Sequence, residues 1–402
     1  MTKVEFHRWQ KEALKAWKDN GHYGTIKAAT GTGKTYVGIA SLYMFDKKPS
    51  TLIIVPTLHL QDQWKKELLR FGCPEGLIGF VGGGKHEWNK KFVIGVINSV
   101  LKSNKCKDHL ILDEVHHYLS EKSIEIFKRD YKTLLGLTAT PERMDQKHNY
   151  LFKIAPLVYE YNVDKAIRQD ILAGFELEYV PLILDEGSRK LYAYYTGTIS
   201  EGMRNYHDMA GLQRAAGNMD FEAINALRQI QKRRQLLLNY PAKIDKAVEL
   251  IKGEIREENA KIIVFCEYIK TANKVKKLLD EDNISCGIYH SGLNKQEKTD
   301  FLESYKEGHT PIMIAVKSLD EGIDVPDTDV GIIIGGSSVK RQMIQRLGRL
   351  LRRKEGKTAK LFQIYIKDTK DEEWMRKRTA HLRQFENKKF NPSQHNIKLS
   401  TY

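Results

Sequence analysis

A glycine-rich segment between a strand-like run and a helix-like run constrains this 402-residue sequence more than any other feature. The run TIKAAT at 25–30 is β-rich, and apolar side chains recur at helical spacing after Thr35. Ala28 to Thr35 reads AATGTGKT, which fits the phosphate-loop pattern GxxxxGK[ST] with Ala in the first position. Glycines let backbone N–H groups turn toward phosphate oxygens, and the next helix adds its positive dipole end. The pattern predicts a phosphate site.

Two carboxylates downstream complement this loop. Asp113 and Glu114 end the apolar run LILDEV, and the carboxyl end of a parallel strand lies beside a phosphate loop. We expect Asp113 to hold Mg²⁺ through water and Glu114 to polarise the attacking water. Lys34 would reach the β- and γ-phosphates, and Thr35 would coordinate Mg²⁺. The remaining loop residues expected to bind the nucleotide are Thr30, Gly31, Thr32 and Gly33.

Short β-rich runs alternate with helix-length segments along most of the chain, which favours parallel sheets covered on both faces. The alternation is interrupted at about 188–240, where the sequence looks helical, and then resumes. We therefore expect two α/β domains, at 1–160 and 161–402, with a helical insertion in the second and a basic tail at about 370–402. The expected strands lie at 25–30, 51–57, 91–100, 109–115, 133–140, 261–268, 285–292, 311–316, 330–336 and 359–366.

The second half carries arginines at helical spacing instead of a phosphate loop. In QRLGRLLR (345–352), Arg346, Arg349 and Arg352 share one face if the segment is helical. Guanidinium groups suit the charge that develops on a transferred γ-phosphate, so we expect Arg349 and Arg352 to act in catalysis. An ordinary basic surface helix is the alternative interpretation of this stretch.

Composition excludes several classes of protein. Apolar runs stay far below the roughly 18 residues of a membrane helix, and the first residues lack the apolar stretch of a secretory signal. The four cysteines are widely separated, which favours reduced thiols and a cytoplasmic location. The net charge of +15 is compatible with a polyanionic partner. Residues 340–402 hold 18 Lys or Arg and 6 Asp or Glu, so most of this excess lies near the C-terminal end.

Taken together, the motifs resemble those of superfamily 2 helicases and translocases over nearly the whole chain. GTGKT (31–35), DEVHH (113–117), LTATP (137–141) and QRLGRLLR (345–352) match the motifs of the superfamily in order and spacing. The resemblance implies two tandem RecA-like parallel-sheet domains that use ATP and Mg²⁺, with closure on ATP driving movement along nucleic acid.

Within the superfamily the sequence is most similar to the XPB branch. The run LDEGIDVPDTDVGIIIGGSS (319–338) and the segment TATPERMD (138–145) carry this similarity, with Met144 where the branch has Glu. The insertion at 188–240 lies where these proteins have a DNA-gripping thumb. Because Gln10 already belongs to the nucleotide site, we expect a reduced form without an N-terminal damage-recognition domain. Small phage and mobile-element helicases share this layout, so we expect a bacterial, archaeal or phage-encoded protein.

The resemblance also implies roles for individual residues. Gln10 resembles the glutamine that reads adenine. Gly322 and Asp324 would contact the nucleotide. The residues expected to couple hydrolysis to movement are His116, Thr138, Thr140 and Gln345. For His116 a structural role is the alternative.

Contacts to nucleic acid are expected where strands end, because motors of this class hold the phosphate backbone through small polar groups. The candidates are Thr57, Asn98, Ser99, Arg143, Ser291, Lys317 and Ser318, and a plain turn role is the alternative for the strand-end residues. Tyr192, Tyr194, Tyr195 and Tyr206 in the insertion could stack on bases, although packing is the favoured interpretation for most of them.

These observations predict a monomeric, ATP-dependent DNA helicase or translocase that acts on forked, branched or duplex DNA without sequence preference. Three alternatives stay open: a motor subunit that serves a nuclease partner in a restriction or defence complex, an RNA helicase, and a non-catalytic scaffold. The scaffold is disfavoured because Lys34, Asp113, Glu114, Arg349 and Arg352 are all present.

Overall fold

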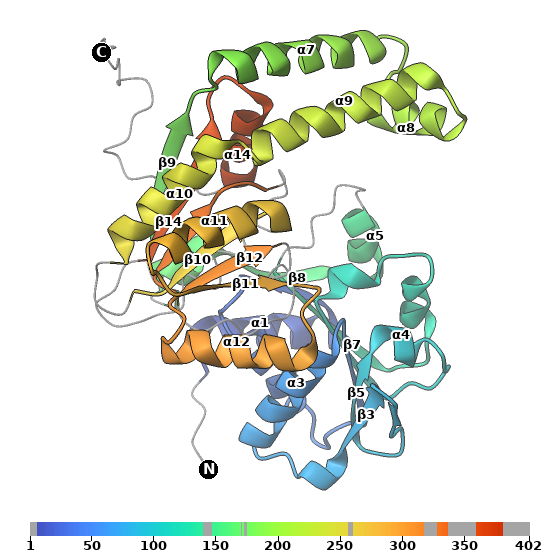
Figure 1. The fold of residues 1–402 in the computed structure, drawn as a ribbon. Helices are drawn as coiled ribbons and strands as arrows, with labels where there is room; N and C mark the ends of the chain where they lie inside the picture. Colours follow the sequence, from blue (N-terminus) through green and yellow to red (C-terminus); the bar gives the residue numbers. More distant parts are fainter. Residues whose placement is uncertain are drawn as a thin grey trace. The chain divides into compact units, whose positions relative to one another are not determined.

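The computed structural model describes residues 6–139, 147–169, 171–172, 175–255, 260–316, 328–336 and 359–380. Its chain divides into two compact units, and the second begins at Phe175. The boundary therefore lies later in the chain than residue 160. The reason is that β8 (Leu157–Tyr161) pairs with β1 (Tyr23–Ala28) and so completes the sheet of the first unit. Figure 1 shows the elements of each unit.

The first unit is built on an eight-stranded sheet in which all neighbours are parallel except β3 and β4. From one edge to the other the strands are β4 (Lys85–His86), β3 (Ile78–Gly82), β5 (Phe92–Val96), β2 (Thr51–Val55), β6 (His109–Asp113), β7 (Thr133–Thr138), β1 and β8. Every residue of β2 and β6 is buried, as expected for central strands covered on both faces.

Short helices connect these strands. The α-helices of this unit are α1 (Arg8–Asp19), α2 (Lys34–Ser41), α3 (Leu58–Arg70), α4 (Ile97–Val100), α5 (Lys147–Ile154) and α6 (Val163–Arg168). The described part of this unit also contains the short 3₁₀ turns η1 (Glu75–Leu77), η2 (Val115–Tyr118) and η3 (Ser123–Lys128). The apolar face of α1 buries Trp9, Ala13 and Trp17, and α3 buries Trp64. These large side chains fix the two helices on the sheet.

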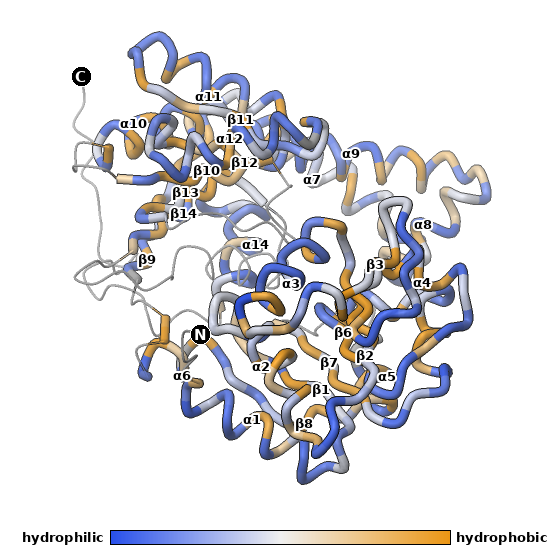
Figure 2. Tube along the Cα trace, turned by 90° about the horizontal axis from the view of Figure 1, so that it is seen from below, coloured by the Kyte–Doolittle hydropathy of each residue, from blue (hydrophilic) through white to orange (hydrophobic). Residues whose placement is uncertain are grey.

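The second unit is built on a six-stranded, all-parallel sheet. The strand order is β11 (Cys286–His290), β12 (Ile312–Val316), β10 (Ile262–Cys266), β13 (Val330–Ile333), β14 (Ala359–Ile366) and β9 (Phe175–Leu182). Its helices near the sheet are α10 (Pro241–Glu254), α11 (Ile269–Glu281), α12 (Lys295–Glu307) and α14 (Lys370–Thr379). In Figure 2 the strands of both units carry hydrophobic colour while many helical residues are hydrophilic.

A helical hairpin extends from this second unit. It comprises α7 (Glu186–Gly202), α8 (Met209–Gly217) and α9 (Phe221–Leu238). These helices occupy the segment at about 188–240 for which the sequence predicts a helical insertion. Helices α7 and α9 lie side by side, with α8 at their far end (Figure 1). Each helix starts at an aspartate whose carboxylate accepts backbone N–H bonds, namely Asp185, Asp208 and Asp220.

The prediction of two parallel-sheet α/β domains is confirmed. Among the described residues, four strands were not predicted: β3, β4, β8 and β9. The run at 91–100 was expected to be one strand, but β5 ends at Val96 and the chain turns into α4 at Ile97. Asn98 and Ser99 therefore lie on a short helix that follows the strand.

Candidate functional site

The predicted phosphate loop follows β1 directly and ends where α2 begins. Gly31 and Gly33 have φ angles of 84° and 90°, a left-handed conformation that glycine adopts without steric cost. Helix α2 starts at Lys34, so the unpaired N–H groups of its first turn point back toward the loop. The Oγ1 atom of Thr30 is buried and has no hydrogen-bond partner within the described part of the chain. This geometry suits a phosphate group.

Gln10 from α1 contacts the same loop. Its side chain is buried, and Nε2 donates to the carbonyl oxygen of Gly33 at 3.2 Å and to that of Thr32 at 3.5 Å. Its Oε1 atom accepts a bond from the backbone N–H of His7 at 2.9 Å. A Cβ atom at Gly33 would lie 2.8 Å from Gln10 Nε2, so a larger residue would displace the end of the Gln10 side chain, and the φ angle of 90° also favours glycine. That Gln10 reads adenine stays a prediction.

Asp113 ends β6, two strands away from β1 in the sheet order. Its Oδ2 atom accepts a 2.7 Å hydrogen bond from Trp64 Nε1, and its Oδ1 atom accepts a 3.1 Å bond from the backbone N–H of Glu114. Burial raises the pKa of Asp113, while the Trp64 bond and the Lys34 charge lower it. The carboxylate is therefore held in one orientation by two donors.

Glu114 lies beside it in a left-handed backbone conformation with φ of 48°. Burial raises the pKa of Glu114, and the charge of Lys34 opposes that rise. A non-glycine residue with positive φ is uncommon and is found more often at functional sites than elsewhere. Because of this backbone conformation, the Glu114 side chain has a different direction from the one it would have if β6 continued as an extended strand.

His116 connects this carboxylate pair to the next strand. Its Nδ1 atom lies 2.9 Å from Thr138 Oγ1, at the end of β7, and 3.4 Å from Glu114 Oε2. Both His116 and Thr138 are fully buried. The structure therefore brings together three predicted residues, Glu114, His116 and Thr138, which come from two adjacent strand ends.

The donor set fits Mg²⁺ bound together with a nucleotide. The hydroxyl of Thr35, at the start of α2, and the carboxylate of Asp113 are both oxygen ligands, the type that Mg²⁺ prefers. Within the described ranges no group of three or more His, Cys, Asp or Glu side chains could hold a metal ion. Mg²⁺ does not need such a group, because it is usually held by one or two protein oxygens, phosphate oxygens and water.

The residues predicted to contact nucleic acid in the first unit also follow the carboxyl ends of parallel strands. These strands are β2 and β5, on the other side of β6 from β7 and β1. Thr57 follows β2, and Asn98 and Ser99 follow β5, its parallel neighbour. Asn98 is exposed, whereas Thr57 caps α3 by accepting a 3.3 Å bond from the N–H of Leu60. In the second unit Ser291 follows β11 and is exposed. These positions are compatible with phosphate contacts, which stay a prediction.

The tyrosines of the hairpin differ from one another. Tyr206 donates a 2.7 Å bond to Asp220 and packs in the hairpin, and Tyr192 accepts a 2.9 Å bond from the N–H of Lys370. The packing interpretation fits both. Tyr194 and Tyr195 have ring centroids 5.8 Å apart, and Tyr194 is exposed.

Nine predicted site residues lie outside the described residues, and their roles stay predictions. They are Thr140, Arg143, Lys317, Ser318, Gly322, Asp324, Gln345, Arg349 and Arg352.

Sequence reasoning missed Trp64. Its indole donates a hydrogen bond to Asp113 and also packs closely on α2. The close packing is shown by Gly38 of α2, where an added Cβ would lie only 2.5 Å from the Trp64 ring. The available signal was a tryptophan on the apolar face of the predicted helix at 60–71, directly after the second strand. A tryptophan that is buried on such a face needs a hydrogen-bond acceptor for its indole N–H.

Two family models match the chain. The model described as "Type III restriction enzyme, res subunit" matches residues 3–143, and the one described as "Helicase conserved C-terminal domain" matches residues 242–354. The first match contains the phosphate loop and the Asp113–Glu114 pair, and the second begins in α10.

Curated relatives match along almost the whole chain. The "DNA 3'-5' translocase XPB2" of Sulfurisphaera tokodaii is 33% identical over 390 residues, which cover 94% of this chain and 85% of the relative. The "DNA 3'-5' helicase XPB" of Kineococcus radiotolerans is 25% identical over 393 residues, covering 94% of this chain and 62% of the relative. The chain likewise spans 58% of a Rad25 relative from Halobacterium salinarum.

Solved structures share the fold. The Hef helicase domain of Pyrococcus furiosus superposes with a TM-score of 0.64 at 19% identity, covering 91% of this chain and 97% of that one. Dbp5 of S. cerevisiae, bound to RNA and ADP BeF3, gives a TM-score of 0.60 at 16% identity, with 94% and 87% covered. Among the described helices of the present chain, none combines the length and apolar character of a membrane span.

Proposed function

The chain belongs to the XPB-like family of superfamily 2 helicases and translocases, and from that premise we propose that it is a motor that couples ATP hydrolysis to movement on DNA. The proposed substrate is forked, branched or duplex DNA held without regard to sequence. The relatives named above are described as acting on DNA in the 3'-5' direction, and we propose the same direction here.

The observation that carries this proposal is the chain of contacts that links Glu114, at the end of β6, to the end of the neighbouring strand β7. Glu114 lies 3.4 Å from His116, which lies 2.9 Å from Thr138. Glu114, which we propose contacts the attacking water, is thereby connected to the end of the neighbouring strand β7 through the buried pair His116 and Thr138. A change at the γ-phosphate that moves Glu114 would therefore also shift the end of β7. Coupling of ATP hydrolysis to movement on DNA requires such a transmitted shift.

The chemistry of hydrolysis follows from the residues at this edge. Lys34 and the N–H groups of the loop would balance the negative charge of the β- and γ-phosphates. Glu114 would accept a hydrogen bond from water and orient it for attack in line with the leaving oxygen. Asp113 and Thr35 would hold Mg²⁺, which neutralises charge on the phosphates. Arg349 and Arg352 are proposed to stabilise the charge that develops at the γ-phosphate.

DNA binding is proposed at the carboxyl ends of β2 and β5 in the first unit and on the helical hairpin of the second unit. Thr57, Asn98 and Ser99 follow adjacent parallel strands, and small polar side chains of this kind suit phosphate oxygens. The helical hairpin is proposed to act as a thumb. Its segment 188–240 has 8 Lys or Arg and 4 Asp or Glu, so it can attract a polyanion.

ATP turnover with different nucleic acids tests the function directly. We expect forked or duplex DNA to stimulate hydrolysis at least tenfold, and RNA to stimulate it less. A strand-displacement assay on the same forks separates unwinding from translocation alone. If RNA stimulated turnover and DNA did not, the RNA-helicase alternative would replace this proposal.

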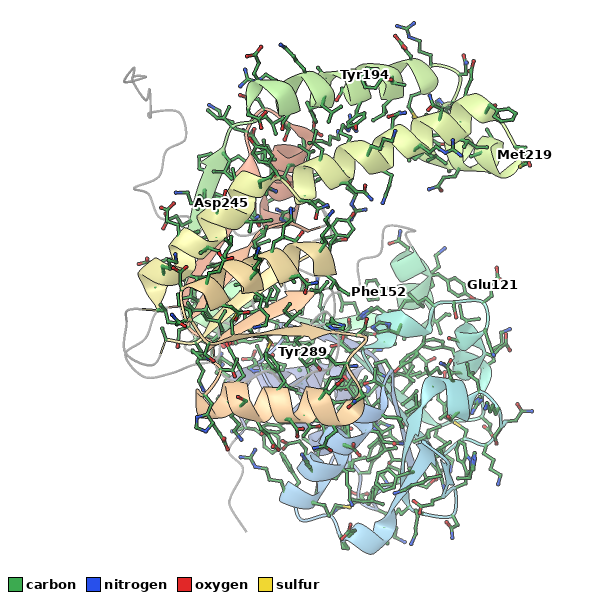
Figure 3. All side chains as sticks on the ribbon, viewed as in Figure 1. Glu121, Phe152, Tyr194, Met219, Asp245 and Tyr289 are labelled. Carbon is green, nitrogen blue, oxygen red and sulfur yellow. The ribbon has the colours of Figure 1, made fainter. Side chains whose placement is uncertain are left out.

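Glu114→Gln tests the assignment of the water-orienting residue. This variant keeps the shape of the side chain but loses its charge, so it should bind ATP and lose turnover by 10²-fold or more. Glu121→Gln is the matched control, because Glu121 is exposed and lies on the same connection a few residues later (Figure 3). Normal turnover in the Glu114 variant would remove this residue from the mechanism.

A further inference from the structure

Three aromatic side chains gather beside the phosphate loop in the first unit. They are Phe6, just before α1, Tyr36, the third residue of α2, and Phe71, the residue after α3. The ring centroids of Tyr36 and Phe71 lie 5.2 Å apart, and those of Phe6 and Phe71 lie 6.0 Å apart. All three side chains are half-buried, so part of each stays accessible to a ligand. They are called the aromatic cluster below.

Tyr36 joins this cluster to Gln10 and the phosphate loop. A Cβ atom added at Gly33 would lie 3.5 Å from Cδ2 of Tyr36 and 2.8 Å from Nε2 of Gln10. The tyrosine ring and the Gln10 amide therefore meet at the same residue of the loop. The backbone N–H of Tyr36 also donates to the carbonyl oxygen of Gly33 at 3.1 Å, which fixes the start of the tyrosine side chain relative to the loop.

The Tyr36 ring is held at its hydroxyl end. Nη1 of Arg70 donates a 2.7 Å hydrogen bond to the hydroxyl oxygen. The Cζ atom of Arg70 is 5.8 Å from the ring centre, at the outer limit of a cation–π contact, so the guanidinium holds the rim of the ring more than it covers the face. Phe71 is tilted by 59° against the ring and does not lie flat on it. Burial and the nearby charge of Glu67 raise the pKa of Tyr36, so the phenol is neutral at physiological pH.

These residues lie where the base of a nucleotide is expected. The γ-phosphate is expected near Glu114, which follows β6, and β6 and β8 lie on opposite sides of β1 in the sheet. Helix α1, which carries Gln10, packs on β1 and β8. A nucleotide whose phosphates bind at the loop with the γ-phosphate toward β6 therefore directs its base toward Gln10 and the aromatic cluster.

We propose that the ring of Tyr36 is the surface on which the base of the bound nucleotide stacks. This inference rests on the proposed use of ATP and adds a base-contacting residue to the expected role of Gln10. A flat aromatic ring suits this task, because every nucleobase has a π face that an aromatic side chain can cover. Arg70 and Phe71 are then positioning residues, since they hold the ring beside the loop.

Binding of two diphosphates to the full chain separates the base contact from the phosphate contacts. ADP carries a base, whereas inorganic pyrophosphate consists of the two linked phosphates alone, and calorimetry in the presence of Mg²⁺ gives a Kd for each. Tyr36→Leu keeps an apolar side chain against Phe71 but has no flat ring. We expect this variant to raise the Kd for ADP about tenfold and to leave the Kd for pyrophosphate within about twofold of the unchanged protein.

Two further variants make the result specific. Tyr36→Phe keeps the ring, so its Kd for ADP should stay within about threefold of the unchanged protein, and a tenfold loss would overturn the stacking role by tracing the effect to the hydroxyl. Tyr43→Ala is the control. It removes a tyrosine ring that is 49% exposed just beyond the end of α2 and whose centroid lies 3.9 Å from Nζ of Lys48. Tyr43 is not part of the aromatic cluster, so neither Kd should change.

The possible failures are distinguishable. If Tyr36→Leu binds ADP as tightly as the unchanged protein does, the ring does not stack on the base and the proposal is overturned. Equal weakening of ADP and pyrophosphate would overturn it too, because the ring would then support the loop and not the base. If DNA fails to stimulate ATP turnover while ADP binding depends on the Tyr36 ring, the motor function is wrong and the base contact stands.

Discussion

The indole Nε1 of Trp64 donates a 2.7 Å hydrogen bond to Oδ2 of Asp113, and both side chains are buried. Trp64→Phe keeps most of the packing against α2 but leaves one carboxylate oxygen without its donor. An unsatisfied buried acceptor costs about 1–3 kcal/mol. We expect this variant to need several-fold more Mg²⁺ for half-maximal ATP turnover, which a titration of Mg²⁺ at saturating ATP would measure.

Trp17→Phe is the matched control for that experiment. Trp17 is also fully buried in the first unit, and its Nε1 atom donates a 2.8 Å bond to the carbonyl oxygen of Leu134. Both variants lose one buried indole hydrogen bond, but only Trp64 contacts Asp113. A similar Mg²⁺ shift in both variants would show that the effect comes from general loss of stability.

The contact between His116 and Thr138 predicts a specific loss of coupling. Thr138→Val keeps the shape of the side chain and removes the hydroxyl that lies 2.9 Å from His116. We expect basal ATP turnover to stay within about threefold, while stimulation by DNA and strand displacement fall at least tenfold. His116→Ala should give the same pattern.

Combining the two changes tests whether they act through one contact. If they do, the double variant should be no worse than either single variant, because each change already breaks the pair. Additive losses would contradict the assignment. Equal loss of basal and stimulated turnover would make the pair part of the hydrolytic site instead.

The sequence predicts those parts of the fold that depend on short segments. The loop from Ala28 to Thr35 is recognisable because phosphate binding requires its residue types in a fixed local order. The largely apolar runs that form β2, β6 and β10 are equally clear. Asp113 and Thr138 could be placed at one sheet edge because parallel strands end on the same side.

Elements with mixed surroundings were harder to predict. Strand β8 is the edge of its sheet and is mostly half-buried or exposed, so LVYEY lacks a long apolar run. Strand β9 is also an edge strand, and FELEYVPL contains acidic residues and Pro181. The Trp64 bond to Asp113 joins residues 49 positions apart, which a local pattern cannot reveal.

Buried His109 predicts how the stability of the first unit depends on pH. Burial lowers the pKa of this side chain to about 3, from about 6.5 in the unfolded chain. The neutral ring is held by Thr133 Oγ1 at 2.8 Å and Ser41 Oγ at 3.1 Å. Stability from this group is therefore present above pH 6.5 and is lost as the pH falls toward 3.

At pH 5.5 this one group should lower the free energy of unfolding by about 1 kcal/mol. His109→Gln keeps polar atoms in the cavity and does not titrate, so its stability should change less between pH 7.5 and pH 5.5. Hydrogen exchange of the β6 amides at both pH values measures this difference. His86→Gln changes an exposed histidine and serves as the control. An unchanged pH dependence in the His109 variant would contradict the prediction.

The last prediction concerns a buried ion pair between Lys243 of α10 and Asp371 of α14. Their charged atoms lie 2.6 Å apart, both side chains are fully buried, and Asp371 also accepts a 2.9 Å bond from the N–H of Ile366. Lys243→Met leaves this carboxylate buried without its cation, which costs about 3–5 kcal/mol. We expect faster hydrogen exchange throughout β14.

Restoring neutrality should reverse most of that loss. In the double variant Lys243→Met, Asp371→Asn neither member of the pair carries a charge, and the amide oxygen can still accept the bond from Ile366. Lys246→Met is the control on the same helix, because Lys246 pairs with an exposed partner, Glu249, and such pairs contribute about 0–1 kcal/mol. If both lysine variants affected β14 exchange equally, the effect would come from α10 as a helix. If the double variant were as unstable as Lys243→Met, the buried charge would not be its cause.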